Sequence, residues 1–134
     1  MTPRFRTTLK VEKIGEDRWR LTAPLIYVST ILGEIIVPEG FVTDFASVPR
    51  LPFAYLLAGN VGHAPSTVHD YLYQCQCTDR ATADAVFHEI LGVDSVPWWR
   101  RLIMYAAVRT LGWASWLQGP DRLATLNPTM GDDG

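Results

Sequence analysis

The chain has no surplus of basic residues, no long apolar run and almost no cysteine. Its 134 residues include two Cys and 12 Lys and Arg against 14 Asp and Glu, for a formal net charge of −2. Without a basic surface, nucleic acid is not expected as a partner. The sequence contains no run of 18 apolar residues that could form a transmembrane helix, and residues 1–9 lack the apolar core of a signal peptide. We therefore expect a protein that neither spans a membrane nor is secreted through a signal peptide.

The two cysteines, Cys75 and Cys77, are separated by one residue. A disulfide between residues this close is expected to be strained, so the sequence predicts two free thiols at a helix end and an intracellular protein. The three histidines could join the thiols around zinc, but zinc sites usually have two ligand pairs that lie farther apart. A zinc site is therefore disfavoured.

A hydrophobic content of 48% in 134 residues is typical of one folded domain with one core. The first third has the pattern of antiparallel strands, rich in β-branched residues and interrupted by a turn at residues 15–17. The segment Phe41–His63 is rich in Pro and Gly and predicts loops around one short helix at Leu51–Leu57. The expected strands cover Phe5–Ile14, Arg18–Ala23, Leu25–Ser29 and Glu34–Val37.

The second half of the chain predicts three helices, at residues 65–74, from 78 or 79 to 92, and from 95 to at least 111. Polar caps and apolar stripes favour them. From Gly119 onward, Gly, Pro and Asp without periodicity predict a flexible tail. The expected fold class is α+β, with N-terminal antiparallel strands followed by a C-terminal three-helix portion. Residues 1–118 form its single domain, and residues 119–134 form the tail.

The segment with the most chemistry is His69-Asp70-Tyr71-Leu72-Tyr73, followed by Asp84. On a helix, His69 and Tyr73 lie on one face because they are four residues apart, and Asp70 points about 100° away. The short link after this helix predicts that the next helix returns alongside it and brings Asp84 beside His69 and Tyr73. An Asp bonded to one imidazole nitrogen fixes the tautomer and leaves the other nitrogen as a base. Asp70 then remains for a hard cation, which prefers oxygen ligands.

The same four side chains can instead form a buried polar network that pins two helices together. Two observations separate these interpretations. A catalytic base must reach a cleft, whereas a structural His can be closed off on all sides, and only a metal site responds to calcium.

The motif His69-Asp70-x-x-Tyr73, followed by Ala83-Asp84-x-x-Phe87, resembles the catalytic helices of calcium-dependent secreted phospholipases, and looks most like their disulfide-free form in parvovirus capsid proteins. The resemblance implies that His69 activates water, that Asp70 binds Ca²⁺, and that Tyr73 and Asp84 orient the His. In that family, carbonyls of an upstream loop complete the calcium site. The segment Tyr55-Leu56-Leu57-Ala58-Gly59-Asn60 is similar to that loop but lacks its first glycine, so Tyr55 and Gly59 are candidate calcium ligands.

A longer resemblance covers roughly Ile35–Gly112. The segment Val37–Arg50, then His69–Tyr73, Arg80 and Ala83-Asp84, resembles a phage and prophage domain of unknown function. This implies a viral or prophage origin, other phage proteins as partners, and a location in the host bacterial cytoplasm or the virion, but no activity. Within it, Asp44 is a candidate cation ligand or the start of an Asx-turn, and Arg50 is a candidate substrate-binding residue or a bridge to the helices.

Aromatic and basic residues gather around the third helix. The pattern fits a lipid headgroup interface, a protein contact surface or a helical core. The residues are Trp98, Trp99, Trp113 and Trp116, with Arg101, Tyr105 and Arg109 along one line.

Three functions are therefore open. The leading hypothesis is a phage-derived hydrolase in which His69, oriented by Asp84 and Tyr73, activates water against a phospholipid or another ester, and Ca²⁺ on Asp70 polarises that ester. The alternative is a non-catalytic phage virion or tail component, or a host-factor binding protein, in which the cluster is structural. The third is a membrane-surface binder without chemistry.

Overall fold

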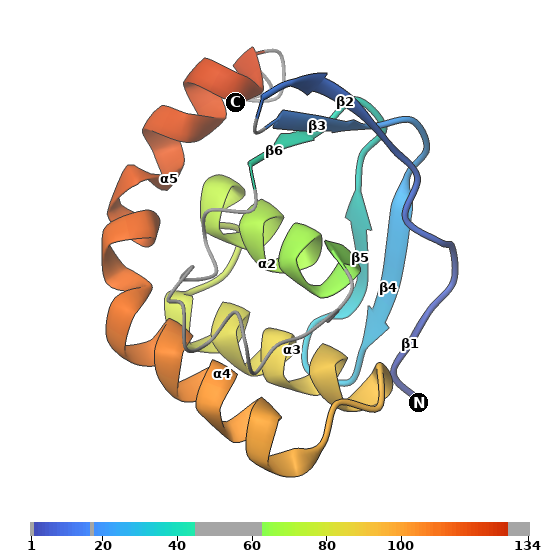
Figure 1. Cartoon of the computed structure of the whole chain (residues 1–134), viewed down its shortest axis with the longest axis vertical. Coiled ribbons are helices and arrows are strands. Elements are labelled where there is room, and N and C mark those ends of the chain that lie inside the picture. Colours follow the sequence, from blue (N-terminus) through green and yellow to red (C-terminus); the bar gives the residue numbers. More distant parts are fainter. Residues whose placement is uncertain (1, 17, 45–62, 129–134) are drawn as a thin grey trace.

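The structure, a computed structural model, describes residues 2–16, 18–44 and 63–128. Within these residues, six antiparallel strands come first and four helices follow, so the predicted α+β class is confirmed (Figure 1). The short helix expected at Leu51–Leu57 lies outside the described residues, as do Tyr55, Gly59 and Arg50.

The strands form two three-stranded sheets, β1-β4-β5 and β2-β3-β6. They are β1 (Arg4–Phe5), β2 (Val11–Gly15), β3 (Arg18–Leu21), β4 (Leu25–Ser29), β5 (Gly33–Val37) and β6 (Val42–Thr43). Strand β4 is mostly buried, whereas β5 alternates, with Ile35 and Val37 in the core and Ile36 exposed. Alternation is expected where only one face of an antiparallel sheet is covered. Gly33 begins β5 with a φ of +76°, which glycine adopts easily because it has no Cβ.

Helix α2 lies at the centre of the fold (Figure 1). The helices are α2 (His63–Cys75), α3 (Arg80–Val93), α4 (Trp98–Leu111) and α5 (Trp113–Leu126). Helices α3 and α5 pack along α2, and α4 packs along α3. Val68 and Leu72 of α2 join Tyr27 and Phe41 in the main hydrophobic core. Among the described residues, no helix is long and apolar enough to cross a membrane.

Helix α5 runs through the segment predicted to be a flexible tail, so the three-helix prediction is incomplete. Pro120 has no N–H for the carbonyl of Trp116, four residues earlier, and Nε2 of Gln76 donates to that carbonyl instead at 2.7 Å. At Gly119, a Cβ would lie 2.3 Å from the carbonyl oxygen of Tyr73, so the missing side chain permits close packing on α2. The tail prediction is therefore wrong for residues 119–127, and residues 129–134 lie outside the described part.

Cys75 and Cys77 form a disulfide, so the predicted free thiols are wrong. Gln76 between them has a φ of +50°, a left-handed conformation that turns the chain back on itself directly after α2. Their Cα atoms are 5.2 Å apart, which lies within the roughly 4.4–6.8 Å usual for disulfides. The argument for an intracellular protein from free thiols no longer holds.

Candidate functional site

Three of the predicted catalytic side chains meet at one carboxylate oxygen. Nε2 of His69 lies 2.7 Å from Oδ1 of Asp84, and the hydroxyl of Tyr73 donates to the same oxygen at 2.7 Å. His69 and Tyr73 come from one face of α2, one helical turn apart, and Asp84 comes from the neighbouring α3. The structure thus brings these three residues together as the sequence predicts, while their catalytic role stays a prediction.

Two arginines bind the other oxygen of Asp84. Arg109 of α4 donates from Nη1 to Oδ2 at 2.8 Å, and Nη1 of Arg80 on α3 donates to it at 3.4 Å. Arg80 also donates to the carbonyls of Val108 and Arg109, at 3.0 and 3.1 Å. Both carbonyls lie in the last turn of α4, and that of Val108 also accepts from the backbone N–H of Gly112 at 2.9 Å. Asp84 therefore connects α2, α3 and α4.

The surroundings of Asp84 keep it ionised. Burial raises the pKa of this carboxyl group, but hydrogen bonds from His69, Tyr73 and Arg109 outweigh burial, and the pKa of Asp84 lies below its ordinary value. Burial and the bond to Asp84 raise the pKa of Tyr73, which stays a protonated donor. Because a carboxylate only accepts hydrogen bonds, Nε2 of His69 carries the hydrogen and donates to Asp84.

The cluster around Asp84 is closed to solvent at its centre. His69, Tyr73 and Asp84 are each 0% exposed. The ring centroid of His69 lies 4.2 Å from that of Tyr73 and 4.8 Å from that of Phe87. Only the arginine side chains reach outward, since Arg109 is 33% exposed.

Asp70, the predicted calcium ligand, is held by three donors. Thr43 Oγ1 of β6 and Gln74 Nε2 of α2 both donate to Oδ2, at 2.6 and 3.0 Å. Nη2 of Arg122 on α5 donates to Oδ1 at 2.7 Å. Asp70 is fully buried, so both of its oxygens are engaged inside the protein.

Arg122 pairs with both aspartates that the sequence predicts as calcium ligands, because it also binds Asp44. Burial lowers the pKa of this guanidinium, but the charges of Asp70 and Asp44 more than offset that effect, so the pKa is raised. A guanidinium in contact with both carboxylates does not fit a calcium ion at the same place, because like charges repel. Among the described residues, no group of three or more His, Cys, Asp or Glu side chains could hold a metal ion.

The candidate ligands Tyr55 and Gly59 and the candidate substrate-binding residue Arg50 lie outside the part of the chain that the structure describes. Their roles stay predictions. Asp70 and Asp44 are the candidate calcium ligands that lie within the described residues.

The network around Asp70 extends to the end of α5. Oε1 of Gln74 accepts from Nδ2 of Asn127 at 3.0 Å, and the Asn127 amide pairs with the backbone N and O of Val42 at 2.7 and 2.9 Å. Sequence reasoning missed Arg122 and Asn127 because both lie in the segment predicted to be flexible. One signal was present: a carboxylate buried on a helix needs a cationic partner, and Arg122 is the only basic residue after Arg109.

A comparison with known protein families matches residues 19–108 to a family described as a protein of unknown function, DUF1353. The match covers more than half of the chain. The chain belongs to the DUF1353 family. In this DUF1353 protein the matched segment contains His69, Tyr73, Arg80 and Asp84. It ends before three of the residues that bind the buried polar groups, which are Arg109, Arg122 and Asn127. Searches of curated proteins and of solved structures gave no match.

Proposed function

We propose that this DUF1353 protein is a non-catalytic phage protein, a virion or tail component or a host-factor binding protein, in which the polar cluster stabilises the fold. The observation that carries the proposal is the complete burial of His69, Asp70, Tyr73 and Asp84, each 0% exposed. A general base must come within hydrogen-bond distance of the proton that it abstracts. The phage origin rests on the motif resemblance alone.

The hydrogen bonds of the two buried aspartates support a structural role. Both oxygens of Asp70 and both oxygens of Asp84 have at least one donor. These donors come from β6, α2, α3, α4 and α5. A buried carboxylate whose two oxygens are both paired favours one arrangement of the surrounding elements, because any other arrangement leaves a buried charge without a partner.

The charges in the cluster also make a bound cation unnecessary. Arg122 supplies one positive charge beside Asp70 and Asp44, where a calcium ion would bring two. Arg109 and Arg80 pair with Asp84. The buried carboxylates Asp70 and Asp84 therefore each have a guanidinium partner from the chain itself.

A hydrolase is the second candidate, and one observation favours it. His69, Tyr73 and Asp84 have the arrangement expected of an oriented general base, with Nε2 of His69 and the hydroxyl of Tyr73 both on Oδ1 of Asp84. In this candidate, Nδ1 takes a proton from water as the water oxygen bonds to an ester carbonyl carbon, and Asp84 stabilises the resulting imidazolium. The proton then passes to the departing alkoxide.

A matched pair of histidine variants separates the two candidates. His69→Gln removes the buried imidazole of α2, whereas His88→Gln changes a partly exposed imidazole of α3 that packs edge-on against Tyr105. Both variants and the wild type are assayed against p-nitrophenyl butyrate and phosphatidylglycerol vesicles, with calcium and with a chelator. Their unfolding by urea is measured in parallel.

The proposal predicts no turnover by any of the three proteins, together with a loss of about 2–4 kcal/mol of unfolding free energy in His69→Gln alone, since a network member and its packing are removed. Turnover by the wild type that is lost in His69→Gln and kept in His88→Gln would establish the hydrolase instead.

A further inference from the structure

Helices α4 and α5 present an apolar surface to the outside of the protein. Trp98 and Leu102 on α4 are 69% and 56% exposed, and Trp113 and Leu117 on α5 are 57% and 68% exposed. Trp99 is 39% exposed beside them. These five side chains, with the exposed Ala106 between them, are called the outer face. Figure 1 shows α4 and α5 along the rim of the molecule, with their far side turned away from α2 and α3.

The spacing in the sequence produces this face. Positions 98, 102 and 106 of α4 are four residues apart, as are positions 113 and 117 of α5, so each set lies along one side of its helix. The opposite side of α4 carries the buried Met104 and Val108, which pack against α3. Both sides of α4 are therefore apolar, although one side is enough to attach the helix to the core.

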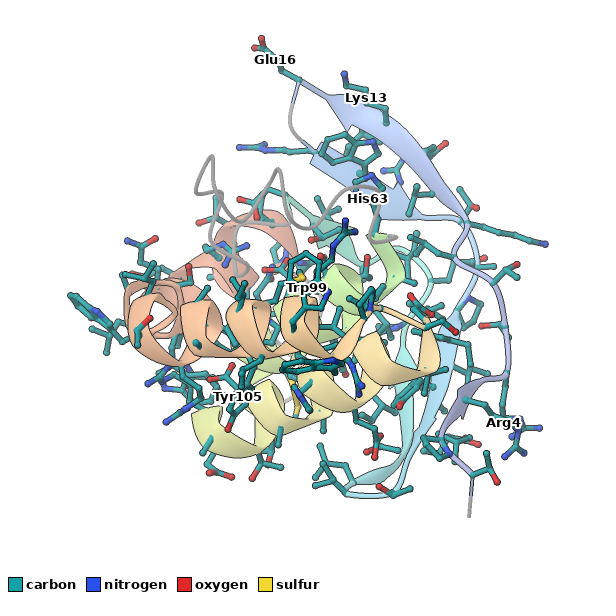
Figure 2. All side chains as sticks on the ribbon, turned by 60° about the horizontal axis from the view of Figure 1, so that its bottom comes forward. Arg4, Lys13, Glu16, His63, Trp99 and Tyr105 are labelled. Carbon is teal, nitrogen blue, oxygen red and sulfur yellow. A yellow bond between two sulfur atoms is a disulfide. The ribbon has the colours of Figure 1, made fainter. Side chains whose placement is uncertain are left out.

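The basic residues of α4 lie against other parts of the protein. Arg109 binds Asp84, Arg101 lies over Gly92 of α3, and the guanidinium of Arg100 lies over the ring of Trp99, 5.2 Å from its centroid. Tyr105, labelled in Figure 2, lies between α4 and α3, with its ring centroid 5.3 Å from that of His88. Along α4 and α5, Asp121 is the only charged residue that is largely exposed to solvent.

This charge pattern decides which partner fits. An anionic membrane surface attracts helices that carry exposed Lys and Arg beside their apolar side, and here the one exposed charge is acidic. A face whose neighbouring arginines are held against the protein's own side chains is instead complementary to another apolar face. A second copy of the same chain supplies such a face in a symmetric pair.

The size of the outer face agrees with this partner. From the exposed fractions of its tryptophans and leucines, the face offers roughly 300–550 Å² of apolar area. A standard interface buries about 800 Å² on each partner, of which about 57–65% is apolar, or about 450–520 Å². The outer face is therefore as large as the apolar part of one side of a stable dimer interface.

We infer that two copies of the chain associate through their outer faces to form a symmetric dimer. The inference builds on the proposed function, because it names the contact through which a non-catalytic protein assembles. The symmetric pair buries Trp98, Leu102, Trp113 and Leu117 of both copies and leaves the Asp84 cluster inside each one.

The test measures the mass of the full chain by sedimentation velocity and light scattering over a roughly hundredfold concentration range, because a dimer dissociates on dilution by mass action. Leu102→Glu and Leu117→Glu place a charge on the outer face. Ile36→Glu is the matched control, since Ile36 is 49% exposed on β5, away from α4 and α5. All three changed side chains are exposed, so the variants are expected to keep the wild-type far-UV circular dichroism spectrum.

The inference predicts a wild type and an Ile36→Glu variant at twice the chain mass of 15.0 kDa, and outer-face variants at the single chain mass. A monomeric wild type at every concentration overturns it, as does a dimer that Leu102→Glu and Leu117→Glu leave intact. A monomer that binds phosphatidylglycerol vesicles through Leu117 overturns it in favour of a membrane surface. Hydrolysis in the preceding assay overturns the proposed function without changing any of these masses.

Discussion

Replacing Asp84 with Asn gives the sharpest prediction, because this one carboxylate connects α2, α3 and α4. The change keeps the shape of the side chain and removes its charge. His69 and Tyr73 lose an ionised acceptor, and Arg109 and Arg80 lose the carboxylate that they share. The NH₂ group of Asn also turns donors toward the arginines, which can only donate, or toward His69 and Tyr73, which donate to this position in the wild type.

The expected loss of unfolding free energy is about 3 kcal/mol. Breaking a buried ion pair by removing one partner typically costs about 3–5 kcal/mol. Arg109 and Arg80 are 33% and 21% exposed, so water relieves part of the unpaired charge, which places the value at the lower end of that range. For a chain of this length the loss corresponds to a fall in melting temperature of roughly 10 °C.

Urea unfolding followed by circular dichroism measures this loss, and Glu12→Gln is the control. Glu12 pairs with Arg20 at the surface, where both side chains are about half-exposed, so its loss should be at most about 1 kcal/mol. A double variant with Arg109→Met should lose less than the sum of the two single variants, because the single changes each leave a charge unpaired. If Asp84→Asn costs no more than Glu12→Gln, the cluster does not hold the fold together and the reasoning is refuted.

Three further predictions concern pH, calcium and the disulfide. Because the pKa of Asp84 is below its ordinary value, the stabilising effect of this carboxylate is present above the unfolded pKa of about 4 and is lost as pH falls through the folded pKa. The difference in urea midpoint between the wild type and Asp84→Asn should therefore shrink below about pH 4. A difference that grows at low pH would contradict this prediction. Calcium should leave the melting temperature of the wild type unchanged, because Arg122 already pairs with Asp70; a calcium-dependent rise that disappears in Asp70→Asn would show a metal site. The Cys75–Cys77 disulfide closes a very short loop, so its reduction should lower the unfolding free energy by at most about 2 kcal/mol. Melting curves with and without a reductant measure this change, and a larger loss would contradict the prediction.

Strands β3, β4 and β5 and the first three helices could be predicted because each is specified by local pattern. The strand expected at Phe5–Ile14 is instead divided into β1 and β2, which lie in different sheets, and β6 lies in the segment expected to form loops. Strand β4 is found at Leu25–Ser29 as expected, since a continuous run of Leu, Ile, Tyr and Val favours a buried strand. The meeting of His69, Tyr73 and Asp84 was also predictable, because helical spacing and a short connection fix it. These features depend on residues close together in the sequence.

The features that could not be predicted depend on contacts between distant residues. Helix α5 continues through Pro120 because Gln76, 40 residues before Trp116, donates to the carbonyl that proline leaves without a donor. The pairing of Arg122 with Asp70 spans 52 residues. The disulfide depends on the left-handed conformation of Gln76, which an ordinary residue rarely adopts and which no local pattern indicates.

The central claim, that His69 is a structural residue sealed inside the protein, is tested most directly by its reaction with diethyl pyrocarbonate, which modifies accessible neutral imidazoles. His63 is exposed to solvent and provides an internal reference for the rate of modification, whereas His69 is 0% exposed. Mass spectrometry of peptides from the treated protein measures both rates. The account predicts that native protein is modified at His63 and not at His69, and that both react in urea. Modification of His69 in the native protein at the rate of His63 would contradict the account and favour the hydrolase as the function.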